Sequence, residues 1–228
     1  MNPQSPPVLH ATPINDLRPT QITLGMYEVG KKRRAWMESD PSKLRDFLAH
    51  HMVPVVIGPK KALYLIDHHH LARALLEEGV KSVFVSYIDD LSRVDASLFW
   101  NVMSFRGWTH PYDAKGRRRP YSELPETIAE MEDDPYRSLS GELRNVGGYA
   151  KDAQPFAEFL WADFLRDRIK ARAIERDFDK ALAEARTLAA LAEASYLPGW
   201  CGKHADDGPS IEADKRRRKS RERAQAGD

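Results

Sequence analysis

The residue types that could carry out chemistry gather at one joint of the chain, where an aspartate and three histidines follow an apolar segment. These four residues are Asp67, His68, His69 and His70. The apolar residues before them (63–66) are typical of a buried β-strand, and the leucines and alanines after them recur at helical spacing until Gly79. Because aspartate is a preferred N-cap, we predict that Asp67 caps a helix and that the four residues form its first turn.

The first turn of a helix is suited to bind an anion. Its backbone N–H groups are free, the helix dipole is positive there, and neutral imidazoles can donate to phosphate or take up a proton. We therefore expect a phosphate group at this joint. The expected phosphate ligands in the turn are His68, His69 and His70, and the candidate catalytic residues in the turn are Asp67, His69 and His70.

A run of histidines is also a candidate metal site. Five of the eight histidines fall between His50 and His70, and histidine-rich tracts bind zinc or other transition ions. Adjacent histidines on one helical turn point in different directions, however, and the chain has no His-Glu-x-x-His pattern. A magnesium ion that arrives with a nucleotide is the better expectation, with Asp67 or Glu28 as its carboxylate, because magnesium needs only one or two protein oxygens.

Glu28 is a further candidate catalytic residue, far from the Asp67–His70 turn in the sequence. It lies in a glycine-flanked segment (25–30) that reads as a loop, and four cations at residues 31–34 open the helical stretch that follows. On residue types alone, such a glutamate is either a solvated charge or a base directed at a bound substrate.

These motifs resemble a known family. The strand, the Asp-x-His-His sequence in residues 67–70 and the helix resemble the phosphate-binding turn of the ParB/sulfiredoxin fold, in the Asp-Gly-His-His-Arg form of ParB-like free serine kinases. Residues 17–29, 134–144 and 156–164 are similar to segments of the putative ParB-like nuclease family. The resemblance covers most of residues 14–200.

The resemblance implies a bound nucleotide or phosphate ester and a role for Glu28 on the substrate hydroxyl. Further candidate phosphate or nucleotide ligands in the similar N-terminal segment are Thr20 and Gln21. The chain departs from the pattern at two positions, since His68 replaces the glycine and Leu71 replaces the arginine. A guanidinium that clamps the phosphate must therefore come from Arg73 or from a distant basic residue.

Length and hydrophobic patterning indicate an α+β fold. The chain has 228 residues, of which 42% are hydrophobic, enough for one large or two small cores. Strands are expected at 14–17, 54–58, 62–66 and 81–89, and Pro19 indicates that the first strand lies at a sheet edge or ends there. Helices are expected at 40–50, 97–103, 123–132, 135–143, 155–176 and 177–194, the last two paired as an αα-hairpin.

The domain organisation follows from these elements. We expect a small mixed-sheet ParB/sulfiredoxin-like α/β domain over residues 14–95 and a helical domain packed on it over residues 96–200. Residues 1–13 contain four prolines and are expected to form a flexible arm. Residues 201–228 are polar, with eight Lys or Arg against six Asp or Glu, and are expected to form a basic, disordered tail.

The formal net charge of +1 implies no overall field for polyanions. Residues 105–120 form an aromatic and basic loop. Its basic part between Lys115 and Arg119 and the C-terminal tail are nonetheless candidate nucleic-acid contacts, the alternatives being a surface loop and a solvated helix end. One cysteine, Cys201, excludes an internal disulfide and a Cys cluster for zinc. Without a long apolar run or a leader pattern, the chain is expected to be cytoplasmic and without membrane contact.

Three functions remain open. The first is a phosphotransferase or phosphohydrolase, of the kinase or NTPase type, that acts on a nucleotide or phosphorylated small molecule. The second is a nuclease that uses the same residues on a phosphodiester. The third is a non-catalytic binding module switched by a nucleotide, as in chromosome-partition proteins, which is the least favoured because the second half has no helix-turn-helix pattern.

Overall fold

The computed structural model describes residues 10–202, so the remaining residues of the expected arm and tail lie outside the described part of the chain. The strands are β1 (His10–Pro13), β2 (Leu17–Pro19), β3 (Thr23–Leu24), β4 (Val53–Ile57), β5 (Leu63–Leu65), β6 (Ser82–Asp90) and β7 (Glu132–Asp133). The helices are α1 (Met26–Met37), α2 (Leu44–His50), α3 (His69–Glu77), α4 (Ala96–Phe105), α5 (Pro135–Asn145), α6 (Ala157–Arg166), α7 (Ala171–Arg176) and α8 (Phe178–Ala189).

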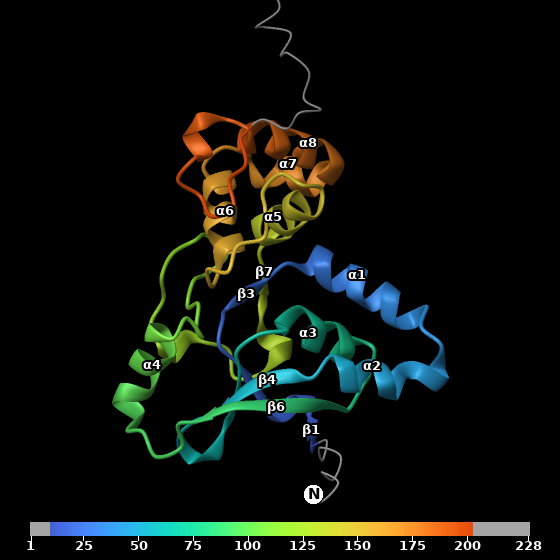
Figure 1. Ribbon diagram of the computed structural model, residues 1–228, viewed down its shortest axis with the longest axis vertical. Coiled ribbons are helices and arrows are strands. Elements are labelled where there is room, and N and C mark those ends of the chain that lie inside the picture. Colours follow the sequence, from blue (N-terminus) through green and yellow to red (C-terminus); the bar gives the residue numbers. More distant parts are fainter. Residues whose placement is uncertain (1–9, 203–228) are drawn as a thin grey trace, which may run out of the picture.

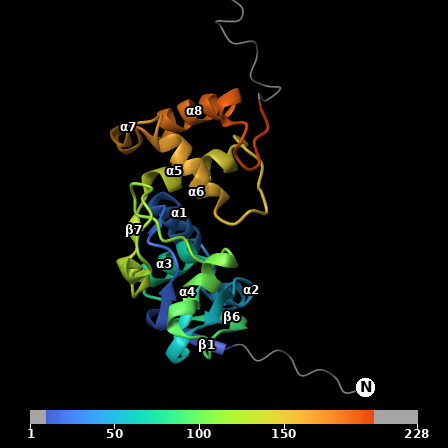
Figure 2. The ribbon, with the colours of Figure 1, turned by 90° about the vertical axis from the view of Figure 1, so that its left-hand side faces the viewer.

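The expected α+β architecture is confirmed. Figure 1 shows the sheet with α1, α2 and α3 in the lower part of the molecule, and α5 to α8 gathered in the upper part. Turned by 90°, the same two parts lie one above the other, with α7 and α8 across the top (Figure 2). In the described part of the chain, none of the helices has the length and hydropathy needed to cross a bilayer.

The main sheet is mixed and has the strand order β1-β6-β4-β5-β2. β4 and β5 form an antiparallel pair, with Val55 opposite Leu65, while β4 pairs with β6 in parallel. β2 is an edge strand parallel to β5, as one of the two interpretations of Pro19 predicted, but Pro19 lies in the strand rather than in the loop expected after residue 17. An edge suits proline because this residue has no N–H group to donate to a neighbouring strand.

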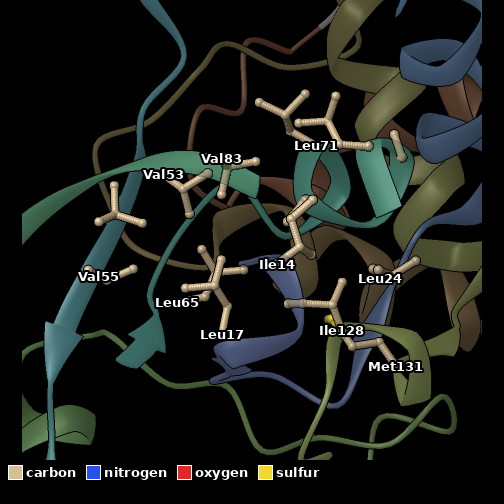
Figure 3. Packing of buried hydrophobic residues seen from close by; sticks show 14 of the residues in the cluster. Ile14, Leu17, Leu24, Val53, Val55, Leu65, Leu71, Val83, Ile128 and Met131 are labelled. Atoms are coloured by element: carbon tan, nitrogen blue, oxygen red, sulfur yellow. The ribbon is translucent and has the colours of Figure 1, made fainter. Parts of the chain in front are cut away.

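One hydrophobic core joins the sheet to α3. Figure 3 shows Val53, Val55 and Leu65 of the sheet directed toward the same interior as Leu71, the first apolar residue of α3. Side chains of this size each stabilise the fold by about 1.5–3 kcal/mol when fully buried. This packing orients α3, so its N-terminal turn is set by the core and by the end of β5.

A second core holds the helical part together. Trp161 of α6 is fully buried, stacks on Tyr149 at a ring distance of 4.4 Å, and donates its indole N–H to the carbonyl oxygen of Pro198 at 2.8 Å. Leu139 and Leu143 of α5 pack in the same cluster. The boundary expected near residue 95 is crossed, however, because the segment around Ile128 and Met131 packs in the first core and β7 pairs with β3.

Four expectations about elements were wrong in detail. Residues 10–13 form β1 on the edge opposite β2, so at least this part of the expected arm belongs to the sheet. Residues 14–16 form a 3-10 turn, and β2 follows at Leu17. Residues 41–43 likewise form a 3-10 turn, and α2 begins only at Leu44. α1 begins at Met26 rather than near residue 31, which places Glu28 in its first turn.

Two expected long helices are interrupted. In place of a helix at 123–132 the chain forms a 3-10 turn (Ile128–Glu130) and β7; Pro125 is unfavourable inside a helix, and the capping box of Thr127 and Glu130 closes only one turn. The expected helix 155–176 is split into α6 and α7. The chain turns at Ile169, whose side chain is buried and whose carbonyl oxygen accepts a 2.7 Å hydrogen bond from Tyr136 Oη.

Candidate functional site in the cleft between the two parts

A cleft of about 770 Å³ lies between the α/β part and the helical part. This volume is in the range of small-molecule sites. Its walls come from α1, the first turn of α3, α5 and the segment leading into α6. Residues of α2, β4 and β6 and the segment after α4 complete the lining. The polar and charged lining residues include Gln21, Glu28, Lys32, Asp67, His68, His69, His70, Arg137, Arg144, Lys151, Asp152, Gln154 and Glu158.

The Asp-His-His-His turn lies on this cleft as a helix N-terminus. α3 begins at His69, and its N-cap is His68 rather than the expected Asp67. His68 has a left-handed backbone with a φ of 65°, and Asp67 Oδ1 accepts the N–H of His68 at 2.6 Å. Glycine adopts positive φ without steric cost, so a glycine at this position, as in the Asp-Gly-His-His-Arg form that the turn resembles, would suit this backbone.

The His69 imidazole is part of the fold. Its Nε2 accepts the backbone N–H of Thr20 at 3.3 Å, and the residue is 4% exposed. Burial lowers the pKa of His69 to about 3, with the nearby His70 acting in the same direction. A neutral imidazole whose Nε2 already accepts a backbone hydrogen bond does not supply that atom to a phosphate, so the expected ligand and catalytic roles of His69 are not supported.

The His70 imidazole holds the start of α1. Its Nε2 accepts the N–H of Gly25, the N-cap of α1, at 2.9 Å, so the ring proton lies on Nδ1. Burial, and then the positive charge of Arg137, keep the pKa of His70 well below 6.5. His70 therefore positions α1 and its Glu28, and a donor role for Nε2 toward phosphate is excluded while this bond persists.

Thr20 is buried and committed to the fold. Its N–H donates to His69, its hydroxyl donates to the carbonyl oxygen of Leu65 at 2.7 Å, and its own carbonyl oxygen accepts the N–H of His110 at 2.9 Å. The expected contact of Thr20 with a phosphate is therefore not supported. Gln21, the next residue, lines the cleft and stays a candidate ligand.

Glu28 stands at the centre of the charged part of the cleft. Its Oε2 lies 3.6 Å from Nε2 of His70 and 3.7 Å from Nη1 of Arg137, and its Oε1 lies 3.6 Å from Nζ of Lys32. These distances exceed hydrogen-bond length, and no group of the described residues donates a hydrogen bond to this carboxylate. Its oxygens are thus free to accept a proton or a hydrogen bond from a ligand.

The first turn of α1 is held by side chains from the helical part. Asp133 Oδ1 accepts the N–H of Met26 at 2.8 Å, and Ser138 Oγ accepts the N–H of Tyr27 at 3.2 Å. A Cβ atom on Gly25 would lie 2.6 Å from Ser138 Oγ, so only glycine permits this approach. Residues from both parts of the molecule therefore set the position of Glu28.

Arg137 is the site residue that the sequence did not single out. Its side chain is 10% exposed, it lines the cleft, and its guanidinium lies 5.3 Å from the ring centre of Phe159. Nε and Nη1 of Arg137 are buried and have no hydrogen-bond partner. A buried guanidinium without partners is costly, so these two donors are available for an anion in the cleft. Arg137 is therefore a candidate for the distant basic residue that the replaced motif arginine calls for.

Arg73 is directed elsewhere and does not line the cleft. Its Nε donates to Glu77 at 2.7 Å, and its Nη1 donates to the carbonyl oxygens of Ile128, Ala129 and Met131 at 2.9–3.2 Å. The expectation that Arg73 binds phosphate is therefore not supported. Its guanidinium instead ties the segment before β7 to α3.

The basic loop expected to touch nucleic acid is also away from the cleft. Arg117 pairs with Asp113, Arg119 pairs with Glu123, and Arg118 lies 5.2 Å from the ring centre of Tyr121. A nucleic-acid contact through this loop stays a prediction, as does one through the C-terminal tail, which lies almost wholly outside the described residues.

A magnesium ion bound with a nucleotide stays an expectation for this cleft. Within residues 10–202, no three His, Cys, Asp or Glu side chains gather as a metal cluster. Magnesium bound with a nucleotide needs only one or two carboxylates. Asp67 fits this need because it is exposed on the cleft and its described hydrogen bond engages one oxygen. Glu28 fits less well, since two cations already face it.

Comparisons with known proteins identify the family of the chain. The family model described as a putative ParB-like nuclease matches residues 10–167. The crystal structure of the protein Atu1540 from Agrobacterium tumefaciens is similar, with 51% sequence identity and a TM-score of 0.81, covering 86% of this chain and 98% of that chain. The search of curated proteins gave no match. The family model spans more than half of the sequence, and the chain therefore belongs to the putative ParB-like nuclease family.

Proposed function

We propose that this protein binds a nucleotide or another phosphate ester in the cleft and transfers or hydrolyses its phosphoryl group. The observation that carries the proposal is the pairing of Glu28 with Arg137. A carboxylate without hydrogen bonds lies 3.7 Å from a buried guanidinium whose Nε and Nη1 have no partner, beside the N-terminus of α3. A phosphate that is attacked by water or a hydroxyl group needs a carboxylate to take the proton of the attacking group and a cation to stabilise the negative charge.

The phosphate would lie between the N-terminal turn of α3 and Arg137. The backbone N–H groups at this turn and the helix dipole attract an anion, and Arg137 adds charge-assisted hydrogen bonds. Lys32 and Lys151 also line the cleft and add positive charge. This arrangement replaces the imidazole donors expected from the histidine run with backbone N–H groups and a guanidinium.

Glu28 would act on the attacking group. The oxygen of a water molecule or a substrate hydroxyl attacks phosphorus, its proton passes to a Glu28 oxygen, and the bond from phosphorus to the leaving oxygen breaks. Phosphoryl transfer requires mainly positioning and charge neutralisation from a protein, so one base and a preorganised anion site are sufficient. When bound with a nucleotide, magnesium supplies charge neutralisation on the phosphates, and Asp67 would hold it.

A nuclease is the second candidate function, because the family carries this description. The same carboxylate and guanidinium would then act on a phosphodiester. A product assay separates the two candidates, since a nuclease shortens an oligonucleotide and a phosphotransferase or phosphohydrolase changes only a terminal phosphate. Binding without any product would instead support the non-catalytic module.

The experiment that tests the proposal is a ligand screen by thermal shift, followed by a product assay with each hit. The screen uses nucleoside mono-, di- and triphosphates, phosphorylated small molecules and a short oligonucleotide, each with and without magnesium. A ligand at 100 times its Kd stabilises the folded state by about 2.7 kcal/mol, which gives a clear rise in Tm. A screen in which no phosphate compound raises the Tm contradicts the proposal.

A further inference from the structure

We infer that the cleft has a second, aromatic subsite at Trp108 and Phe156, which binds the planar ring of a nucleobase. The inference rests on the proposed function and narrows its ligand from phosphate esters in general to nucleoside phosphates. Two kinds of observation support it. One is the packing of Trp108 and the backbone conformation of Phe156, and the other is the presence of both charged and apolar residues in the lining of the cleft.

Trp108 is fixed at the end of α4. Its N–H donates to the carbonyl oxygen of Met103 at 2.9 Å, and its ring packs on the cluster that contains Met103 and Phe99. The guanidinium of Arg106 lies 4.8 Å from the ring centre and is itself paired with Asp89. The indole is therefore supported by the protein, and it is half-buried while lining the cleft.

Phe156 is held in an unfavourable backbone conformation. Its φ is 62°, in the left-handed region, which is rare for a bulky side chain. It is the N-cap residue of α6, it lines the cleft, and its ring lies 5.0 Å from that of His110 and 6.0 Å from that of Phe159. Strained residues of this kind are found preferentially where a ligand is bound.

The two aromatic residues belong to segments that touch each other. A Cβ atom on Gly107 would lie 2.8 Å from Cγ of Pro155, so the backbone before Trp108 contacts the residue before Phe156. Ile88 and Pro155 line the same cleft and add apolar surface. One portion of the cleft is thus aromatic and apolar, and another carries Glu28 and its neighbouring cations.

A ligand that fills both portions needs a planar ring and a negatively charged group. Inorganic phosphate and small phosphate esters have the second feature only. Nucleoside phosphates have both, and nucleobases of every kind stack on aromatic side chains through their π-faces. The ring would therefore lie against Trp108 and Phe156, with the phosphates directed to Arg137 and the first turn of α3.

The test compares two ligands by calorimetric titration, ATP and inorganic tripolyphosphate, which share the phosphate chain and differ in the nucleoside. Trp108→Ala should weaken ATP binding by roughly 5- to 150-fold, the range for one lost stacking contact. Tripolyphosphate binding should stay within about 2-fold of wild type, because the anion site is unchanged. Trp108→Phe should restore most of the ATP affinity, since it keeps an aromatic face.

Phe105→Ala is the matched control, because Phe105 lies on the same turn, is 92% exposed and is not among the lining residues. Its affinities should equal those of wild type. An equal loss for ATP and tripolyphosphate in Trp108→Ala, or no loss for ATP, overturns the aromatic subsite. Because binding is measured without turnover, an inactive protein that still shows the ligand-specific loss would contradict the proposed reaction and leave the subsite supported.

Discussion

Two largely buried arginines of the helical part differ in what surrounds them. Arg166, at the end of α6, donates to both carboxylate oxygens of Asp134, at 3.2 and 2.9 Å, and to the carbonyl oxygen of Ala114 at 2.6 Å. Arg137, one turn into α5, faces the cleft, and its Nε and Nη1 have no hydrogen-bond partner. Both guanidiniums lie near an aromatic ring, Tyr136 for Arg166 and Phe159 for Arg137.

Their hydrogen-bond partners indicate different roles: Arg166 stabilises the fold, whereas Arg137 is suited to bind a ligand. Asp134 is 1% exposed and also caps α5 by accepting the N–H of Tyr136 at 2.9 Å, so the Arg166 pair joins α5 to α6. Arg137 has no such carboxylate, since Glu28 stays at 3.7 Å. A fold that leaves donors of a buried cation unpaired loses stability, and an incoming anion recovers it.

The largest expected effect is a loss of stability when the buried pair of Arg166 and Asp134 is broken. Asp134→Ala leaves the buried Arg166 with only the exposed carboxylate of Asp163 and removes the α5 cap, so the free energy of unfolding should fall by about 3–5 kcal/mol. Asp177→Ala is the control, because Asp177 caps α8 by accepting the N–H of Lys180 but is exposed, and it should cost about 1 kcal/mol. Urea unfolding measures both, and equal losses would contradict the special role of the buried pair.

Acid should destabilise the protein through its buried histidines. Burial lowers the pKa of His69 and of His110 to about 3, and that of His70 well below 6.5. Between the ordinary pKa near 6.5 and these values the unfolded chain binds more protons, so stability is complete above pH 6.5 and falls as the pH falls. Each histidine should contribute a loss of up to about 2 kcal/mol from pH 6.5 to 5.

The measurement is urea unfolding at pH 5, 6 and 7, with His50→Gln as the control. His50 is exposed on α2, so this variant should follow the wild-type pH dependence. Arg137→Met should show a weaker loss in acid, because the positive charge of Arg137 is one cause of the low pKa values of His70 and His110. A stability that does not change between pH 5 and 7 would show that these imidazoles are not buried as neutral groups.

Arg137→Met should affect binding and leave stability intact. Methionine keeps the length of the side chain and removes the unpaired charge, so the free energy of unfolding should stay unchanged or rise. The affinity for a phosphate ligand should fall by about 1.5–3 kcal/mol, the range for a hydrogen bond to a charged group. Arg144→Met is the control, since Arg144 also lines the cleft but pairs with Glu158, and its affinity loss should be smaller.

The smallest expected effect is a gain of stability from replacing His68, the N-cap residue of α3. His68→Gly places glycine at a φ of 65°, where it is favoured, and removes a side chain whose buried Nδ1 has no hydrogen-bond partner. The free energy of unfolding should rise by up to about 1 kcal/mol, as measured by urea unfolding. A decrease of more than 1 kcal/mol would mean that the contacts of the His68 side chain outweigh its backbone strain.

The parts of the molecule that could be predicted from the sequence depend on local signals. β5 and α3 follow one another within a short stretch, so an apolar run and helical spacing were sufficient to find them, although the capping preference placed the N-cap one residue too early, at Asp67. The edge position of the first predicted strand was one of the two interpretations that Pro19 allowed. The resemblance to ParB-like proteins, confirmed over residues 10–167, added the fold.

The features that could not be predicted from the sequence depend on contacts between distant segments of the chain. The start of α1 is fixed by Asp133 and Ser138, which lie far along the chain, so Glu28 could not be placed on a helix from its neighbours. His69 and His70 have the residue type of a ligand, but their acceptor atoms are used by Thr20 and Gly25. Arg137 reaches the cleft only because α5 packs against α1.

The most direct test of the proposed reaction is Glu28→Gln with the nucleotide or phosphate ester found in the screen. Glutamine keeps the size of the side chain and removes the base, so turnover should fall by about 10²–10⁴ while the ligand affinity, measured by titration with and without magnesium, stays within about 3-fold. A loss of affinity in magnesium alone would assign Glu28 to the metal instead. Wild-type turnover in Glu28→Gln would contradict its role as the base and with it the proposed mechanism.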